Sequence, residues 1–301
     1  MNLSDKLVEC VPNFSEGRDK AKMERIIDCF RGVDDVKLLD YSNDVSHNRM
    51  VITAVGSPEA MKNAVVNAIR TAVREIDLNH HHGEHPRMGS ADVVPFIPIR
   101  NMTMDEAVQL AKEVAAEVSI SNDLPVYLYE KAASALHREN LADVRKGQFE
   151  GLTAKMQDPL WKPDFGPSTP HPTAGATIIG ARNFLIAWNV NLNTDNLDIA
   201  KAIAKRVRFS SGGFPCVKAL GINLAEKGQV QISMNLTDFT QTSMHQVFDC
   251  IHEEAASRGV SIANSEIIGM LPMEAAVESA VHYLQIEDFT MNRILENRLL
   301  E

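Results

Sequence analysis

The chain contains few cysteines, and those it has are scattered. Its 301 residues include only Cys10, Cys29, Cys216 and Cys250, with no CxxC pair among them. Scattered cysteines of this kind fit reduced thiols in a cytoplasm better than a disulfide framework. The first residues alternate polar and apolar types without the long apolar core of a signal peptide. We therefore expect a cytoplasmic protein.

The chain also lacks a net positive charge and long apolar runs, and these two absences argue against two kinds of partner. The formal net charge is −10, whereas general nucleic-acid binding requires a basic face that contacts phosphates. No stretch approaches the roughly 18–20 consecutive apolar residues that span a bilayer. We expect neither nucleic acid nor membrane as a partner. An anionic small molecule stays a candidate, because an acidic protein can hold a locally positive pocket.

Apolar runs alternate with amphipathic helical patterns along the whole chain, in two successive halves. A segment dense in proline and glycine, 158–175, precedes the junction between them. This order predicts an α/β (α+β) fold of two subdomains, 1–180 and 181–301, each a mixed β-sheet covered by helices on one face. Pro95 and Pro98 predict that the strand 91–99 lies at a sheet edge, or that they lie near its end. The predicted strands are 6–13, 36–42, 49–56, 91–99, 125–130, 176–181, 183–192, 217–225, 230–236 and 260–269.

Four histidines lie close together in HHHGEHPRMG, residues 80–89. Histidine is a common zinc ligand, so a metal-dependent hydrolase built on His80–His85 is one hypothesis. Gly83 and Pro86 interrupt the segment, however, which makes a helical metal face of the HExxH type a poor match. Three consecutive histidines in a loop are more often a solvated tract.

His85 has a different setting from the three histidines before it. Pro86 stiffens the backbone beside it, and Gly89 allows a close approach to the following strand. An unperturbed imidazole titrates near 6.5 and can exchange a proton at neutral pH. A neighbouring carboxylate such as Glu84 could fix the tautomer of His85 or raise its pKa, although adjacency in sequence does not establish contact. His85 is therefore a candidate acid/base catalyst.

Two polar loops are candidate binding segments. In the first, 40–49, Asn48 could orient a polar group and Arg49 could receive a carboxylate in a bidentate contact. The second is GPSTPHPTAG, which is either a rigid linker or a clamp for a flat heteroaromatic ligand. Neither loop contains a phosphate-binding glycine motif. The residues of the second loop are Gly166, Pro167, Ser168, Thr169, Pro170, His171, Pro172, Thr173, Ala174 and Gly175.

Several longer motifs, spread in collinear order over nearly the whole chain, resemble those of the glutamate formimidoyltransferase family. The same family includes the N-terminal part of the bifunctional formimidoyltransferase–cyclodeaminases. The motifs are VECVPNFSEGR at 8–18, HNRMVITAVG at 47–56, GEHPRMGSADVVPFIPI at 83–99, PVYLYE at 125–130, DFGPS at 164–168, GATIIGARNFLIAWNVNL at 175–192 and VQISMNLTDF at 230–239.

The resemblance implies transfer of a formimidoyl group between N-formimidoyl-L-glutamate and N5 of tetrahydrofolate, as in histidine degradation. It implies two α/β subdomains with a ligand tunnel between them, tetrahydrofolate as co-substrate, no metal, and a homodimer. The catalytic histidine of the family falls on His85, and its folate-binding stretch falls on Gly166–Gly175. Arg49, Arg87 and Arg182 are candidates for the carboxylates of glutamate and folate.

Three alternatives remain open at this point. A glycine formimidoyltransferase, or a 5-formyltetrahydrofolate cycloligase-like activity, would use the same fold with another substrate. A metal-dependent hydrolase would use His80–His85 as ligands. A folate-binding protein without chemistry would bind the cofactor but not turn over.

Overall fold

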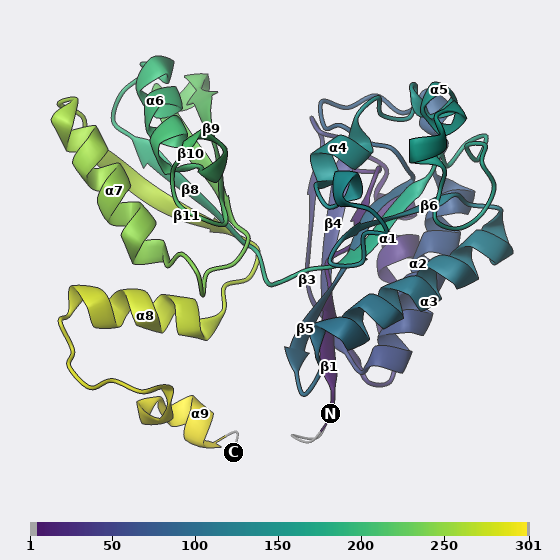
Figure 1. The fold of residues 1–301 in the computed structure, drawn as a ribbon, viewed down its shortest axis with the longest axis horizontal. Coiled ribbons are helices and arrows are strands. Elements are labelled where there is room, and N and C mark those ends of the chain that lie inside the picture. Colours follow the sequence, from purple (N-terminus) through teal and green to yellow (C-terminus); the bar gives the residue numbers. More distant parts are fainter. Residues whose placement is uncertain (1–4, 300–301) are drawn as a thin grey trace. The chain divides into compact units, whose positions relative to one another are not determined.

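The computed structural model describes residues 5–299, and the chain divides into two compact units, Met1–Arg182 and Asn183–Glu301 (Figure 1). Each unit has its own hydrophobic core around its own sheet. We describe the two units separately.

The first unit contains a seven-stranded mixed sheet. β4 and β5 flank the short strands β1 and β2, and β3 pairs with β4 at one edge. On the other side, β7 lies between β5 and β6, and these three strands run parallel to one another. The strands are β1 Leu7–Cys10, β2 Asn13–Phe14, β3 Val36–Asp44, β4 Arg49–Gly56, β5 Ala91–Arg100, β6 Val126–Glu130 and β7 Thr177–Ala181.

Three helices cover one face of this sheet: α1 (Lys20–Ile27), α2 (Pro58–Glu75) and α3 (Met104–Asn122). In Figure 1, α2 and α3 run side by side across that face. A capping box between Thr103 and Glu106 begins α3. Alternate strand residues such as Val94 and Phe96 pack into the core beneath the helices. On the opposite face, α4 (Leu141–Arg145) and α5 (Leu152–Gln157) cover only part of the sheet, over a smaller core that includes Tyr127 and Ile178.

The strand 91–99 does not lie at a sheet edge, because β5 is an interior strand of the sheet. The alternative holds for Pro98, which lies near the end of β5, and not for Pro95. Pro95 lies opposite the break between β1 and β2, where its carbonyl accepts a hydrogen bond from Val11 N at 3.4 Å. No regular ladder there requires an N–H from residue 95. The register between β1 and β5 shifts at Leu7 and Val8, next to Pro98. Local irregularity in the neighbouring strands therefore makes room for both prolines.

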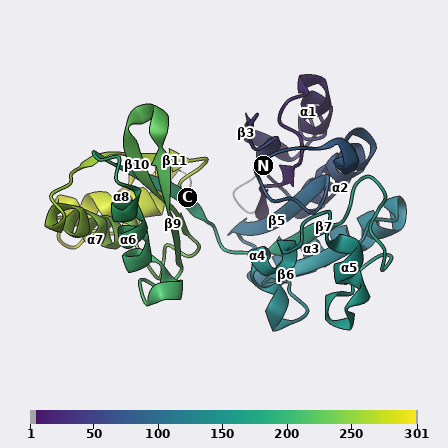
Figure 2. The same ribbon diagram turned by 90° about the horizontal axis from the view of Figure 1, so that it is seen from above.

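The second unit contains a four-stranded sheet in the order β11-β8-β10-β9, antiparallel throughout. Its helices α6 and α7 lie on one face (Figure 2), over a core that includes Trp188, Val190 and Ile232. Its elements are β8 Ile186–Leu192, α6 Leu197–Val207, β9 Val217–Leu224, β10 Gln229–Leu236, α7 Met244–Ser257, β11 Ile262–Ile268, α8 Met273–Tyr283 and α9 Leu295–Leu299. Short 3₁₀ helices occur in the chain at Leu78–His80, Leu136–Arg138, Pro159–Trp161, Phe209–Ser211, Ala225–Lys227 and Met291–Arg293.

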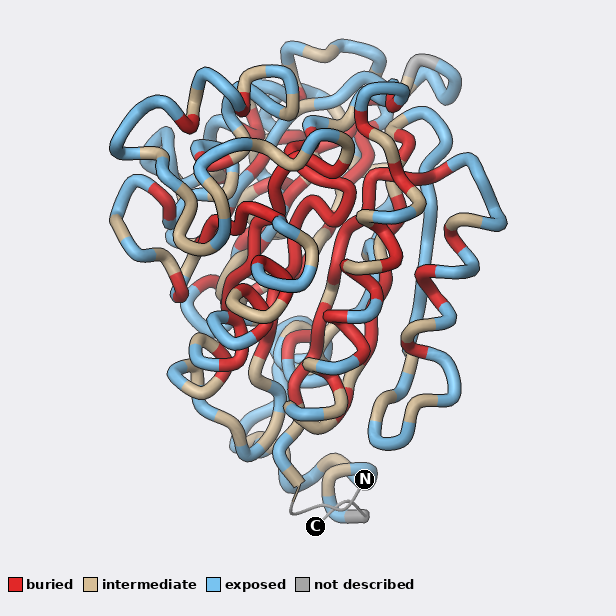
Figure 3. Tube along the Cα trace, turned by 90° about the vertical axis from the view of Figure 1, so that its right-hand side faces the viewer, coloured by how far each residue is buried: buried red, intermediate tan, exposed pale blue. Residues whose placement is uncertain are grey.

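The predicted fold class, two sheets covered by helices, is confirmed, with the refinement that the second sheet is antiparallel rather than mixed. Buried residues follow the strands and the sheet-facing sides of the helices, and exposed residues gather in the loops (Figure 3). Within residues 5–299, no helix combines the length and apolar composition that crossing a membrane would require.

Candidate active site

His85 lies in a small cleft of the first unit, in the loop that leads from the 3₁₀ helix Leu78–His80 into β5. The start of β4 supplies Arg49, the loop before β4 supplies His47, and the start of β5 supplies Asp92. The rings of His47 and His85 meet edge to face, with 6.0 Å between their centroids. The cleft is therefore lined by two segments distant in sequence, 47–49 and 81–92, together with Phe14 and Ser15.

Burial lowers the pKa of His85 to about 4, and the positive charges of Arg49 and Arg145 add to this effect. The negative charge of Asp92 opposes it without cancelling it. The imidazole is therefore uncharged at neutral pH and has a lone pair available to accept a proton. Its conjugate acid, once formed, donates a proton readily.

Of the two possibilities for Glu84, raising the pKa of His85 is not what the structure shows. Glu84 is exposed, and its backbone N–H donates to the carbonyl of Ser46. The carboxylate that does act on His85 is Asp92, seven residues further along the chain. The physical reason is that His85 and Glu84 are adjacent in a loop that directs one toward the cleft and the other toward solvent.

The other three histidines fall into two groups. His80 and His82 are exposed, as expected for a solvated tract. His81 is buried: it is only 7% exposed, and its Nε2 lies 2.9 Å from the carbonyl of Asn48. Its Nδ1 accepts a hydrogen bond from Nε of Arg87 at 3.2 Å. His81 thus connects the loop of His85 to the loop before β4 and has more structural weight than the sequence indicated.

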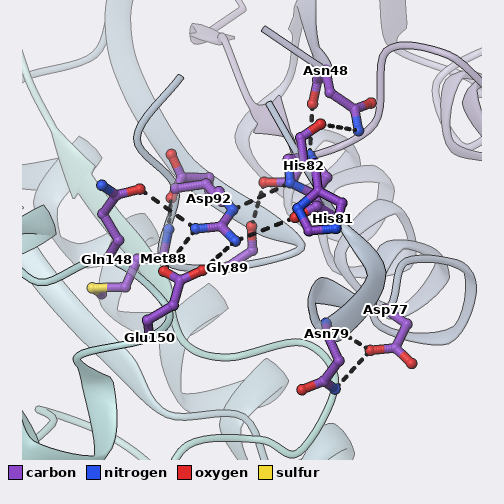
Figure 4. Close-up of polar contacts among 12 residues, drawn as sticks. Asn48, Asp77, Asn79, His81, His82, Met88, Gly89, Asp92, Gln148 and Glu150 are labelled. Atoms are coloured by element: carbon purple, nitrogen blue, oxygen red, sulfur yellow. Dashed lines mark hydrogen bonds and ion pairs between the residues drawn. The ribbon is translucent and has the colours of Figure 1, made fainter. Parts of the chain in front are cut away.

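Arg87 completes this network. Its guanidinium donates two hydrogen bonds to the carboxylate of Glu150, at 2.6 and 2.9 Å, and is buried. Figure 4 shows Glu150 and His81, which both accept hydrogen bonds from this guanidinium, and Gln148, which accepts from Nη1 at 3.4 Å. Arg87 therefore has its donors engaged inside the protein. This fits a role in holding the loop better than the substrate contact that we expected.

Asn48 is also engaged within the protein. Its Oδ1 accepts from Gly17 N at 2.9 Å, and its Nδ2 donates to the carbonyl of His82 at 3.1 Å. The backbone of Asn48 has a positive φ of 49°, a conformation that asparagine adopts more readily than most residues. Asn48 joins three segments around the cleft, so its amide positions loops.

Arg49 differs from Arg87 and Asn48, whose side chains are engaged within the protein. Among the described residues, its buried Nε has no hydrogen-bond partner. Burial and the charge of Arg145 lower the pKa of Arg49 to about 10, so the group stays cationic at neutral pH. Of the residues expected to bind a carboxylate, Arg49 is the one that offers an unpaired donor beside His85.

The loop 166–175 packs against the segment that carries His85. The carbonyl of Thr173 accepts from Leu78 N at 2.8 Å, and Ala176 N donates to the carbonyl of Met88 at 3.1 Å. The bridge between Gly89 and Gly175 continues this pairing. A Cβ at Gly175, where φ is +70°, would collide with the carbonyl oxygen of Met88. The close approach at Gly175 is thus to the protein's own backbone, whereas we had expected a ligand there.

The earlier part of this loop is more open. Gly166, Ser168, Thr169 and Pro172 are exposed or half-buried, so their hydroxyl and backbone groups are accessible. His171 Nδ1 accepts from Ala174 N at 3.0 Å and stabilises the turn that follows.

Arg182, which follows β7, lies near a different buried acid. Its positive charge acts on Glu9, a β1 residue that is 4% exposed. Burial raises the pKa of Glu9 to about 7 despite Arg182. Sequence reasoning missed Glu9, Asp92 and Arg145. The only signal for the first two was a charged residue within an otherwise apolar strand pattern, in LVEC and ADVV.

No group of three or more His, Cys, Asp or Glu side chains within residues 5–299 is arranged to hold a metal ion.

Comparison with known proteins identifies the family. Residues 7–182 match the formiminotransferase domain, N-terminal subdomain, and residues 187–299 match the formiminotransferase domain. The chain belongs to the formiminotransferase family. A glutamate formimidoyltransferase of Streptococcus pyogenes serotype M1 is 46% identical, with 98% of this chain and 99% of the relative covered. One from Thermoplasma acidophilum is 45% identical, with 97% of each chain covered.

A longer relative shares the formiminotransferase region. The formimidoyltransferase-cyclodeaminase of Sus scrofa is 39% identical over 98% of this chain and 56% of its own length. The predicted family and the predicted transferase class of this formiminotransferase are therefore confirmed.

Proposed function

We propose that this formiminotransferase moves a formimidoyl group between N-formimidoyl-L-glutamate and N5 of tetrahydrofolate, the co-substrate, as in the degradation of histidine. One structural observation carries the proposal: the His85 imidazole shares a cleft with Arg49, and burial together with the charges of Arg49 and Arg145 keeps its pKa low enough for it to be uncharged at neutral pH. Such a site can accept a proton from an attacking amine while it holds an anionic substrate. The names of the two glutamate formimidoyltransferases support the choice of donor.

The reaction needs one proton to move between two nitrogens. N5 of tetrahydrofolate attacks the carbon of the protonated amidine, forming a C–N bond and a tetrahedral intermediate. His85 accepts the proton from N5 and then donates it to the glutamate nitrogen, whose bond to carbon breaks. Glutamate and 5-formimidoyltetrahydrofolate leave, and His85 returns to its neutral form. Proton transfer by one positioned side chain contributes roughly 10²–10⁴-fold in rate.

The folate contact of residues 166–175 is part of the proposal. Ser168 and Thr169 offer accessible hydroxyls, and the hydrogen bonds of Thr173 and Ala174 tie the loop to the segment that carries His85. A ligand held there would be fixed relative to the imidazole, and such positioning can supply a large part of the rate.

The proposal includes a cytoplasmic homodimer. The four cysteines are free thiols, which supports a reducing compartment. Exposed apolar side chains on and after α8, among them Tyr283, Leu284 and Ile286, support self-association.

The test is a direct assay. Purified protein is mixed with tetrahydrofolate and either formimidoylglutamate or formimidoylglycine, and 5-formimidoyltetrahydrofolate is followed. We expect turnover with the glutamate donor and little with the glycine donor, which lacks the side-chain carboxylate. Preferred turnover of formimidoylglycine would move the assignment to a glycine formimidoyltransferase. Folate binding without turnover of either donor would overturn the proposal.

A further inference from the structure

Two half-buried guanidinium groups of the first unit each have a buried Nε that finds no acceptor within the described residues. These donors are Nε of Arg49 and Nε of Arg145. A buried N–H of a charged group that lacks a partner is costly, and native structures rarely keep one without a reason. Arg49 and Asp92 line the cleft together with His85, and Arg145 is hydrogen-bonded to Asp92, so both arginines belong to the surroundings of His85. The positive charges of both act on His85.

The local charges do not balance. Arg145 Nη2 donates to Asp92 Oδ2 at 2.6 Å, and Asp92 Oδ1 accepts from Met88 N at 2.7 Å. Asp92 is 3% exposed, and both its oxygens are engaged. It is the carboxylate that offsets the charge of Arg49 most strongly, with a smaller contribution from Asp44. Two cations therefore share one fully buried anion.

Other buried arginines of the same unit show what a satisfied guanidinium looks like. Arg138 donates to Asp164 at 2.8 Å and to the carbonyls of Leu160 and Lys162 at 2.8 and 2.7 Å. Arg87 donates to Glu150 and His81. In both, the donors meet acceptors from the protein. Arg49 and Arg145 lack this at Nε, next to the candidate catalytic histidine.

We propose that Arg49 and Arg145 form an anion subsite beside His85 that binds a carboxylate of the acyl donor, with Asp92 holding Arg145 in place. Arg145 is thereby assigned a substrate-binding role, and Asp92 a positioning role. The identity of the anion as a donor carboxylate rests on the proposed function. Guanidinium groups suit it because their planar donors match a carboxylate in geometry and charge.

The subsite also couples substrate binding to proton transfer. An anion placed between the two arginines offsets the positive charges that disfavour protonation of His85. Binding of the donor therefore raises the proton affinity of His85 at the moment when it must accept a proton. Before the donor binds, burial and the two cations keep the pKa of His85 low and the imidazole neutral.

The first test measures anion binding without turnover. The probe is glutarate, a dicarboxylate without an amidine, and its Kd for the full chain is measured by calorimetry. Neutral glutaramide is the control ligand. Arg70→Gln is the control variant, because Arg70 forms an ion pair with Glu117 between α2 and α3, on the helix-covered face of the sheet. We expect glutarate to bind, Arg145→Gln to weaken its binding at least tenfold, and Arg70→Gln to leave Kd within twofold.

The second test follows the His85 imidazole by NMR as pH is varied. Saturating glutarate should raise the pKa of His85 in the unmodified protein, and Arg145→Gln should raise it without any ligand. If Arg145→Gln does not fold, Arg145→Lys and the glutarate titration of the unmodified protein decide. Equal glutarate binding in Arg145→Gln, or a His85 pKa indifferent to saturating glutarate, would overturn the subsite. Glutarate binding with no formimidoyl transfer would keep the subsite and remove the proposed function.

Discussion

The faces of the two sheets that carry polar side chains differ in chemistry. In the first unit, the residues gathered around the cleft are charged or titratable and largely buried, with His85, Arg49 and Asp92 at its centre. In the second unit, the face turned away from α6 and α7 carries neutral amides. Gln231 Nε2 donates to Asn191 Oδ1 at 3.0 Å, and Asn191 Nδ2 donates to Asn264 Oδ1 at 2.7 Å. These three residues form a ladder across β10, β8 and β11.

The difference indicates that the polar side chains of the two units have different chemical roles. Buried charges interact strongly, shift one another's pKa values and can move protons. Amides donate and accept hydrogen bonds at every pH without changing charge. We therefore expect the proton chemistry to take place in the first unit. The amide ladder of the second unit provides pH-independent structure.

One titratable cluster lies in the second unit, away from the amide ladder. The rings of His245 and His282 stack between α7 and α8 with 4.1 Å between centroids, and His282 also pairs with Asp249. Burial and the charge of His282 lower the pKa of His245. This pair lies between two helices and not on the sheet face that carries the amide ladder, so the contrast between the polar faces of the two sheets still holds.

The largest expected effect is on His85. His85→Ala should lower turnover roughly 10²–10⁴-fold and leave folate affinity within a few-fold, the pattern of a lost acid/base. Steady-state kinetics and equilibrium binding of folate measure the two quantities. The matched control is His80→Ala, an exposed member of the same histidine tract, which should change neither. Near-normal turnover of His85→Ala, or loss of activity on treatment with a chelator, would return the histidine cluster to a metal-site interpretation.

The next effect is at Gly175, where a side chain would collide with backbone. Gly175→Val places a β-branched residue at a φ of +70° and a Cβ against the Met88 carbonyl. The backbone conformation alone costs roughly 1–2 kcal/mol, and the collision adds to it. We expect a fall in the free energy of unfolding of more than about 2 kcal/mol, together with loss of turnover, because the loop of His85 must shift.

The control for that variant lies in the second unit. Gly212 has a φ of +88°, and no atom lies within 4 Å of the place that a Cβ would take, so Gly212→Val introduces the strain without the collision. Urea unfolding of both variants separates the two contributions. Equal losses at the two positions would show that the contact between Gly175 and Met88 does not matter.

A third prediction concerns pH. The pKa of Glu9 in the folded protein is about 7, above its ordinary value of 4.5, so the folded state favours the protonated form. Between these values the unfolded chain releases a proton that the folded chain keeps. The stability due to Glu9 is therefore full below pH 4.5 and is lost as pH rises to about 7, on the order of 3 kcal/mol in total.

Glu9→Gln should remove this component. His85, whose pKa is lowered by folding, contributes the opposite slope between pH 4 and 6.5, because the unfolded chain there binds a proton that the folded chain refuses. The informative quantity is hence the stability of Glu9→Gln minus that of the unmodified protein, measured by urea unfolding from about pH 4.5 to 8. The difference should rise with pH. A flat difference would mean that Glu9 is ionised in the folded state throughout this range.

These residues also show what sequence could and could not predict. Apolar alternation predicted both sheets and their helices because burial imposes the pattern locally. The EHPRMG motif selected His85. Asp92 and Arg145, which are 53 residues apart, could not be paired from sequence, because only the folded arrangement of β5 and α4 brings them together. For the same reason, the sequence could not show that the pKa of His85 is lowered. Adjacency in a loop placed Glu84 beside His85 in sequence but not in the cleft.

The smallest expected effect tests the second unit. Gln231 is 7% exposed, and Gln231→Ala leaves the buried Oδ1 of Asn191 without its donor. The loss should be about 1–2 kcal/mol in the free energy of unfolding, the usual cost of an unsatisfied buried acceptor. In contrast to Glu9→Gln, the loss should be the same at about pH 5 and pH 8, because neither amide titrates. The double variant Gln231→Ala with Asn191→Ala should be less destabilised than the sum of the two single variants, since the orphaned acceptor is then gone. A loss that varies with pH would show that the amide ladder is coupled to titrating groups, and the proposed separation between the two units would fail.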